Sequence, residues 1–189
     1  MNMQKIIKKE ILELKSILDR IDGKELKKFS LLCKEGQKTI KNNKIMFCGN
    51  GGSASDSQHL ATELVVKYKK KRSAIPAIAL TTDTSVLTAI GNDYDFKKIF
   101  SRQVEALGRR GDILILITTS GDSQNLIEAV KIAKKKKIKT FCFSGNNGGQ
   151  IKSYCKNTII IKSNNSSLIQ VVEIFLGQIF CGYLEKKIS

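Results

Sequence analysis

The stretch that organises this chain reads Cys48-Gly49-Asn50-Gly51-Gly52-Ser53-Ala54-Ser55-Asp56-Ser57-Gln58-His59-Leu60-Ala61-Thr62-Glu63. The apolar residues 45–47 come just before it and predict a strand that enters a glycine-rich turn and then a helix. Free backbone N–H groups at the start of a helix suit an anion. His59 and Glu63 are four residues apart and share one helix face, where they can serve acid–base or metal chemistry beside that anion.

Length and composition indicate one globular domain. The chain has 189 residues, of which 41% are hydrophobic, and the apolar residues fall in short separate runs. No run approaches the roughly 20 apolar residues of a membrane span. The first 20 residues carry charges throughout and lack the apolar segment of a signal peptide. We therefore expect a cytoplasmic protein.

The five cysteines predict free thiols in a reducing compartment. They are odd in number, scattered, and form no Cys-x-x-Cys pair. Buried unpaired thiols are common in apolar segments, so neither disulfides nor a zinc–thiolate site is expected.

The formal charge of +16 raises the question of nucleic-acid binding. The lysines are spread over every segment, however, and the densest runs, 69–72 and 134–137, lie at predicted helix ends, where they complement the helix dipole. There is no basic patch interleaved with aromatic residues and no RNA- or DNA-binding motif. Nucleic acid is thus not the expected partner, and the charge fits either a general lysine bias or steering of anionic substrates.

Two helices are predicted before the first strand, at residues 4–20 and 25–41, from apolar positions at helical spacing. A long amphipathic N-terminal helix with a spare apolar face often meets another subunit. We expect a single domain over residues 1–189, with oligomerisation helices in 1–42 and an α/β core with a last helix in 43–189.

From Lys44 onward, apolar strands alternate with amphipathic helices. The predicted strands are 45–48, 75–80, 113–118, 140–143 and 158–161. The predicted helices between and after them are 53–68, 84–90, 96–106, 123–135 and 166–186. This order predicts a three-layer α/β/α sandwich around a five-stranded parallel sheet, with ligands beyond the C-terminal strand ends.

Polar loops follow the first and third predicted strands. After the third strand, hydroxyls and backbone N–H groups gather at a helix start, which can bind a phosphate without a cationic side chain. Ordinary N-capping explains one such loop, but two of them favour a sugar-phosphate site. Neither loop has the lysine of a P-loop or a G-x-G-x-x-G pattern.

His59 and Glu63 admit two interpretations. A lone helical histidine is often structural, and Glu63 can be its solvated partner. Alternatively, because their helix begins at the phosphate loop, Glu63 is placed to act as a general base in an enediol proton transfer. The His-x₃-Glu spacing also suits a metal.

Four segments resemble bacterial phosphoheptose isomerases, which are sugar isomerase (SIS) domain proteins. They are residues 48–64, 77–94, 100–108 and the loop Thr119-Ser120-Gly121-Asp122-Ser123, and the similarity extends over about residues 44–185. The resemblance implies a SIS fold and a homotetramer built partly through N-terminal helices. It also implies isomerisation of sedoheptulose 7-phosphate to D-glycero-D-manno-heptose 7-phosphate, the first step towards activated heptose.

The resemblance further implies a role for each site residue. Glu63 would be the base that moves a proton between C1 and C2. Phosphate would be held by Ser53, Thr118, Thr119, Ser120 and Ser123. The sugar would be lined by Asn50, Gly51, Gly52, Asn92 and Asp93, with Gln170 also at the substrate. Many members bind zinc between subunits, here through His59, Glu63, Gln170 and the position of Gln178.

The last helix departs from the family pattern. The family usually has histidine where this chain has Glu173 and Gln178, and the second of these histidines serves as catalytic acid/base and zinc ligand. An amide cannot exchange a proton near pH 7, and its carbonyl oxygen is a weak zinc ligand. We therefore expect a weak zinc site with low occupancy.

Three interpretations follow from this departure. The chain is an isomerase that relies on Glu63 while Gln178 orients the sugar, and loss of a general acid costs roughly 10²–10⁴-fold in rate. Alternatively, Glu173 supplies the second carboxylate, although it points about 140° away from Gln178 around the helix. Or the chain has lost the activity and serves as a sugar-phosphate sensor or a tetrameric binding scaffold, like the replication-initiator-associating protein that resembles these isomerases.

Overall fold

In the computed structural model, which describes residues 2–188, the five apolar runs form one parallel sheet. The strands are β1 (Ile45–Gly49), β2 (Ala77–Ala79), β3 (Ile113–Thr118), β4 (Lys139–Gly145) and β5 (Thr158–Ile161). They lie in the order β2-β1-β3-β4-β5, and every neighbouring pair is parallel. The predicted fold class is confirmed. Residues 1 and 189 of the predicted domain lie outside the described part.

Side chains alternate between the two faces of the sheet and build two cores. Phe47 and Ile115 belong to the core on one face, whereas Cys48 and Leu116 belong to the core on the other. Strands buried on both faces are typical of parallel sheets covered by helices. All five cysteines are free and buried.

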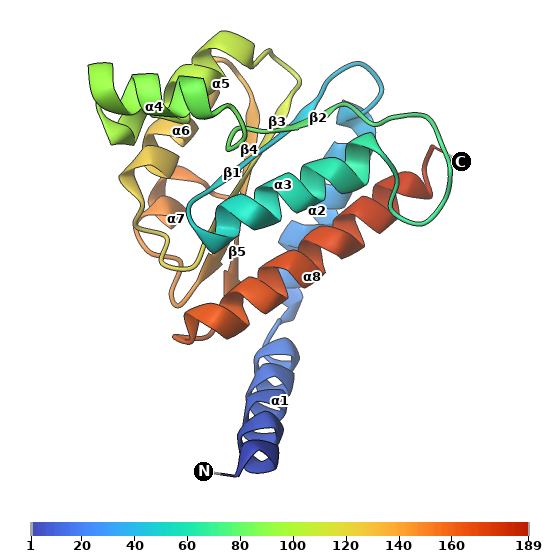
Figure 1. Ribbon diagram of the computed structural model, residues 1–189. Coiled ribbons are helices and arrows are strands. Elements are labelled where there is room, and N and C mark those ends of the chain that lie inside the picture. The colour runs from blue at the N-terminus through green and yellow to red at the C-terminus, as the bar shows by residue number, and fades with distance from the viewer. Residues whose placement is uncertain (1, 189) are drawn as a thin grey trace.

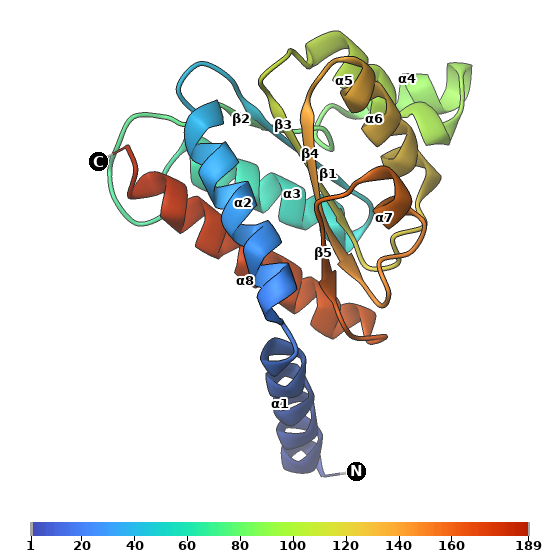
Figure 2. The same cartoon turned by 180° about the vertical axis from the view of Figure 1, so that it is seen from behind.

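Helices cover both faces of the sheet (Figures 1 and 2). One layer contains α2 (Gly23–Thr39), α3 (Gly52–Val65) and α8 (Ser166–Glu185). The other contains α4 (Thr84–Asp93), α5 (Ser101–Leu107), α6 (Gln124–Lys135) and the short α7 (Ile151–Tyr154). Within the first layer α3 and α8 run side by side in the same direction, which places residues of both helices along one seam.

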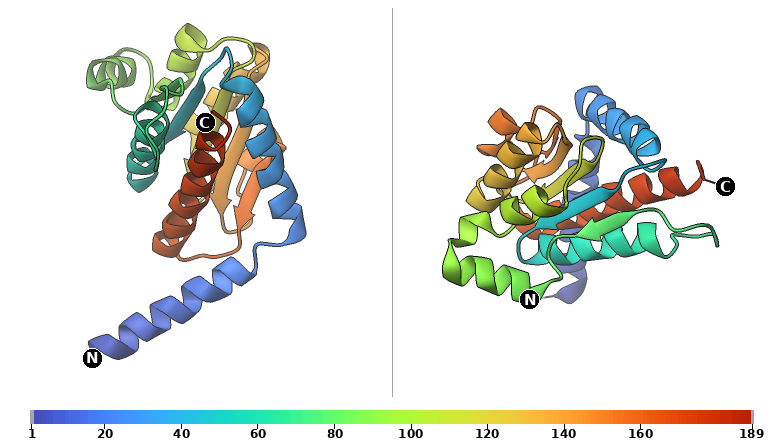
Figure 3. Two further views of the ribbon diagram at one scale, coloured as in Figure 1. Left: turned by 90° about the vertical axis from the view of Figure 1, so that its right-hand side faces the viewer. Right: turned by 90° about the horizontal axis from the view of Figure 1, so that it is seen from above.

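Helix α1 (Met3–Asp19) projects from the body of the domain (Figure 3). Ile17 near its end is buried, but Met3, Ile7, Ile11 and Leu12 are exposed. The helix therefore carries the spare apolar face that the sequence predicts.

Several boundaries differ from prediction. Strand β2 has three residues instead of six. The predicted helix 96–106 is divided into a 3₁₀ turn, η1 (Phe96–Lys98), and α5, because Asp95 caps a separate turn by accepting the N–H of Lys97.

Helix α3 ends at Val65, three residues before the predicted end at residue 68. The backbone N–H groups of residues 68–70 donate instead to the carboxylate of Glu185 on α8. Helix α7 was not predicted.

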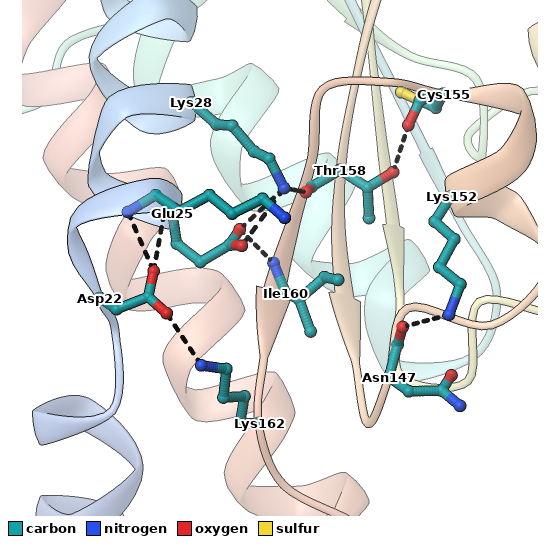
Figure 4. A network of polar contacts seen from close by, with 10 residues as sticks. Asp22, Glu25, Lys28, Asn147, Lys152, Cys155, Thr158, Ile160 and Lys162 are labelled. Atoms are coloured by element: carbon teal, nitrogen blue, oxygen red, sulfur yellow. Dashed lines mark hydrogen bonds and ion pairs between the residues drawn. The ribbon is translucent and has the colours of Figure 1, made fainter.

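Side chains of α2 close the outer edge of the sheet at β5 (Figure 4). The buried carboxylate of Glu25 accepts the N–H of Ile160 at 2.8 Å, and Lys28 donates to the carbonyl of Thr158 at 2.5 Å. Asp22 caps the start of α2 and pairs with Lys162 beyond the strand. An edge strand whose polar groups are occupied by side chains is protected from pairing with another chain.

Helix α8 is long and apolar enough to cross a membrane by length and composition, with a mean hydropathy of 1.6 in its best window. The helix is not an unbroken apolar run, because Gln170, Glu173 and Gln178 interrupt it. Half of that window is buried inside the domain, where Phe180 and Leu184 join the core. A core helix that packs on α3 and the sheet accounts for this composition.

Candidate functional site

The site lies where the chain direction switches between β1 and β3. The loop after β1 leads to α3 on one face of the sheet, and the loop after β3 leads to α6 on the other. The side-chain amides of Asn50 and Asn125 join these two loops. Each amide donates to the oxygen of the other, at 3.0 and 2.8 Å. The starts of α3 and α6 are therefore held together, as the strand order predicts.

Two glycines, Gly51 and Gly52, shape the turn after β1. Gly51 has a φ of 55°, a backbone conformation that residues with a side chain rarely adopt. A Cβ on Gly52 would lie 2.7 Å from Oε1 of Gln170, so this glycine lets α8 approach the turn. The structure thus brings together the predicted substrate residues of this loop and Gln170, with Ser53 buried beneath them.

The loop after β3 arranges its hydroxyls around the start of α6. Thr118 Oγ1 accepts the N–H of Gly121 at 3.1 Å, and Ser120 Oγ accepts the N–H of Asp122 at 3.2 Å. Ser123 is the N-cap residue of α6 but makes no side-chain bond to the helix that it caps. Its hydroxyl and the helix start can therefore receive an anion, together with the half-buried Thr119.

The loop after β4 supports the loop after β3. Gly121 has a φ of 75°, and a Cβ on it would collide with the carbonyl oxygen of Gly148. The N–H of Ile151 donates to the carbonyl of Gly121 at 2.8 Å, and the N–H of Gln150 donates to Asp122 at 2.9 Å. The glycines of the loop after β4 therefore allow close packing against the loop after β3.

An acid–base cluster lies on the seam of α3 and α8. His59 Nε2 is 3.0 Å from Glu63 Oε1, and Gln178 Nε2 is 3.5 Å from His59 Nε2. The side chain of Glu63 is 20% exposed and that of His59 is 48% exposed. The cluster therefore presents a carboxylate that is shielded but reachable, and an imidazole that contacts both neighbours.

The four predicted metal ligands do not meet within one chain. Gln170 lies at Gly52, about two turns and 12 Å before Gln178 along α8. The remaining donors are one imidazole, one carboxylate and one amide, and the first two bond to each other. Across residues 2–188, no three His, Cys, Asp or Glu side chains are grouped to hold a metal ion. This donor set fits zinc poorly.

Asn92 and Asp93 lie apart from the other predicted site residues. They end α4 and are exposed, with the amide of Asn92 donating to Asp93 at 2.8 Å. Asp93 lines a separate cavity of about 370 Å³ with Tyr94 and Arg102. Nothing in the sequence indicates this separation.

Two acidic residues, the buried Glu173 and the half-buried Asp56, lie on α8 and α3. Glu173 has no exposed surface, and burial raises its pKa well above the usual range, with a further contribution from Asp56. Burial also raises the pKa of Asp56, opposed by His59. Asp56 belongs to the segment 48–64 that carries the family resemblance, whereas local sequence patterns do not single out Asn125 as part of this region.

Comparison with known proteins agrees with this arrangement. The family model described as SIS domain matches residues 11–145. A phosphoheptose isomerase of Nitratiruptor sp. is 46% identical over 184 residues, covering 95% of this chain and 97% of that protein. One from Clostridium acetobutylicum is 52% identical over 145 residues, covering 77% and 74%.

Two solved structures show the same similarity in three dimensions. The phosphoheptose isomerase of Neisseria gonorrhoeae superposes with a TM-score of 0.89 at 35% identity, covering 98% of this chain and all of that one. The enzyme of Francisella tularensis gives a TM-score of 0.92 at 30% identity with the same coverage.

Proposed function

We propose, since this chain belongs to the SIS-domain family of phosphoheptose isomerases, that it converts sedoheptulose 7-phosphate to D-glycero-D-manno-heptose 7-phosphate for activated-heptose synthesis. The chain is an aldose–ketose isomerase of sugar phosphates. One observation carries the finer proposal: the anion-binding loops after β1 and β3 meet, and Glu63 lies on the helix that begins at the first loop.

The phosphate is held without a cationic side chain. Two helix starts, those of α3 and α6, direct backbone N–H groups and their dipoles to the place where the loops join. The hydroxyls for this task are those of Ser53, Thr118, Thr119, Ser120 and Ser123. The lysine-rich surface raises the encounter rate of a dianionic substrate.

Glu63 acts as the base. Its carboxylate removes a proton from C1 of the ketose, which gives an enediol, and returns the proton to C2 of the aldose. The hydrogen bond of 3.0 Å from His59 orients the carboxylate. The partial burial of Glu63 keeps bulk water away from the transferred proton.

A second proton has to move between the two enediol oxygens. Gln178 cannot carry it, because an amide does not exchange protons near neutral pH, and so its role is to orient the sugar. His59, 3.5 Å from Gln178, is the neighbouring group that can exchange a proton, and we assign it this transfer.

Catalysis on this proposal needs no tightly held zinc. The donors at the seam fit zinc poorly, since an amide stands where a strong third ligand is required. Elemental analysis of protein purified without chelators is expected to find far less than one zinc per chain. A stoichiometric zinc content contradicts this proposal.

Assembly into a homotetramer completes the site. Asn92 and Asp93 are exposed and lie away from the other site residues of their own chain, so we assign their substrate contacts to a neighbouring subunit. Exposed apolar residues support such contacts on α1 and also on α8, where Val171, Phe175 and Ile179 are open. A cytoplasmic location stays a prediction.

The deciding experiment is an isomerase assay on a panel of C5–C7 ketose phosphates. Turnover of sedoheptulose 7-phosphate is expected, and Glu63→Gln should lose at least about 10²–10⁴-fold in kcat. Glu105→Gln is the matched control, since Glu105 is an exposed glutamate of α5 that pairs with Arg102. Gln178→His tests whether an exchangeable group at that position raises kcat.

One outcome favours the scaffold alternative. If the protein turns over none of these sugars at any zinc concentration, and instead retains a purified replication initiator, the isomerase proposal is wrong.

A further inference from the structure

Arg72 lies in the segment that connects α3 to β2, yet its side chain is almost completely buried. Only 3% of the Arg72 side chain is exposed, and its partner Glu185 on α8 is 4% exposed. The lysines at 69–71, directly before it, are all exposed. A buried guanidinium is costly unless it is paired and hydrogen-bonded, so the burial of this one cation points to a specific task.

The guanidinium of Arg72 connects the backbone of Glu63 with the carboxylate of Glu185. Its Nη2 donates to the carbonyl oxygen of Glu63 at 2.7 Å. Its Nε lies 3.7 Å from Oε1 of Glu185, which makes an ion pair. Its Nη1 donates to the carbonyl oxygen of Ser73 at 3.0 Å. Because the donors of a guanidinium have a fixed planar geometry, one side chain links the end of α3 to the end of α8.

The bond from Arg72 falls on the last turn of α3, which carries the proposed base. The last four carbonyl groups of a helix have no partner within the helix. Those of Thr62 and Leu64 accept backbone N–H groups from the segment that follows, at 2.9 and 3.0 Å. Arg72 supplies the donor for Glu63 between them, and its positive charge complements the helix dipole at this end. The turn that positions Glu63 is therefore protected from fraying.

Glu185 anchors the other side of this link. Its carboxylate accepts the backbone N–H groups of residues 68–70 at 2.9–3.2 Å. Burial raises the pKa of Glu185, but these hydrogen bonds and the charge of Arg72 outweigh burial and leave the pKa below its usual value. About two turns and 10 Å earlier on the same helix, Gln178 contacts His59. The ion pair thus ties α3 to the helix that brings Gln178 to the seam.

We propose that Arg72 is a positioning residue of the isomerase site: its guanidinium fixes the last turn of α3 to Glu185 and so sets the place of the Glu63 carboxylate on the seam. Arg72 acts through the backbone of Glu63. The turn at Gly52 lies roughly 16 Å away along α3, so phosphate binding is largely independent of this link. This inference rests on the proposed function, since it concerns the base of that reaction.

The test compares the kinetics of the wild type and Arg72→Lys on sedoheptulose 7-phosphate. Lysine keeps the positive charge, but its single ammonium group cannot hold Glu63 and Glu185 in the fixed geometry of a guanidinium. The kcat per folded molecule is expected to fall at least about tenfold, because a small displacement of a catalytic group has an effect of that size. KM should stay within about threefold. An unchanged kcat overturns the proposal, and so does a loss confined to KM.

Asp112→Asn is the matched control for a loss of stability. Asp112 is also a buried acidic residue that accepts backbone N–H groups, those of Lys44 and Arg109. It precedes β3, at the end of the sheet remote from the site. Asp112→Asn is expected to lower stability without changing the kcat of the folded enzyme. If it lowers kcat as much as Arg72→Lys does, Arg72 acts through stability alone and the proposal is wrong.

An NMR signal from His59 separates this inference from the proposed function. His59 is the single histidine of the chain, so its imidazole resonances are identified directly in protein labelled on histidine. Because His59 Nε2 lies 3.0 Å from Glu63, movement of the last turn of α3 should shift these resonances at constant pH in Arg72→Lys and not in Asp112→Asn. If no sugar phosphate is turned over, the proposed function fails. A shifted His59 signal then still supports the link through Arg72, and an unchanged signal overturns it.

Discussion

At the scale of the residue, the backbone conformation of Gly121 determines the shape of the loop after β3. Its φ of 75° turns the backbone so that the loop packs against Gly148 while the hydroxyls of Thr118 and Ser120 stay bound to the loop itself. A side chain at this position is strained both by the backbone and by the collision.

Gly121→Ala is expected to lower the free energy of unfolding by about 1–3 kcal/mol and to raise KM for the sugar phosphate. Urea unfolding and the isomerase assay measure these two effects. Gly91→Ala is the control, because a Cβ there meets nothing within 4 Å and the residue lies inside α4. The control should be neutral or gain about 0.4–1 kcal/mol. Equal stability of the two variants contradicts the argument.

Asp112 makes a second prediction at the residue scale. Burial raises its pKa, but hydrogen bonds from Lys44 and Arg109 outweigh burial and leave the pKa below its usual value. A lowered pKa contributes stability that is present above the ordinary value of 3.8 and is lost as pH falls through the folded value. Asp112→Asn should cost about 1–3 kcal/mol at pH 7, with the difference shrinking in acid. Urea unfolding from pH 7 down to pH 3 checks this, and a difference that stays constant would contradict it.

At the scale of the element, α2 packs on the sheet and its side chains also form hydrogen bonds with the backbone of the edge strand β5. Glu25 and Lys28 occupy a donor and an acceptor of β5 that would otherwise be free (Figure 4). An open edge strand is a template for pairing with another chain.

Glu25→Leu is expected to cost about 1–3 kcal/mol and to increase aggregation, since the N–H of Ile160 and Lys28 both lose a partner. Thermal unfolding and turbidity at rising protein concentration measure these effects. Lys27→Leu on the exposed part of the same helix is the control for added apolar surface. If both variants aggregate equally, edge protection is not the reason.

At the scale of the whole molecule, α1 projects from the domain and α8 leaves apolar residues exposed, which is the surface on which the proposed homotetramer depends. Ile7 and Ile11 of α1 are 51% and 59% exposed, which is unusual for large apolar side chains aligned on one helix face. The domain body does not use this face.

The double variant Ile7→Lys with Ile11→Lys is expected to form a smaller assembly than the wild type while the domain stays folded. Buried apolar surface stabilises about 25 cal/mol per Å², and two charges at the contact reverse that contribution. Light scattering gives the mass, and circular dichroism reports the fold. Lys9→Gln on the same helix should leave the mass unchanged. An unchanged mass in the double variant removes α1 from the interface.

The sheet and the first half of the site could be predicted from short-range patterns. Apolar runs of strand length, separated by helical periods, specify a parallel sheet because burial of the strands on both faces requires helices between them. The turn from Gly49 to Ser53 and the carboxylate of Glu63 belong to one strand–turn–helix unit, so their proximity follows from the spacing alone. Boundaries such as the end of α3 depended on Glu185, 117 residues from Tyr68, and escaped prediction.

Contacts between residues that are far apart in the sequence became known only from the tertiary structure. The pairing of Asn50 with Asn125 joins residues 75 positions apart, and the contact of Gln178 with His59 spans 119. The burial of Glu173 likewise depends on α8 lying along α3 and against the end of β3. Local spacing determines which side chains share a face of one element, whereas the meeting of two elements depends on the shape of the whole core. That is why the stretch 48–63 predicts a candidate base and a candidate anion-binding turn, whereas the side chains that contact them from other elements depend on tertiary packing.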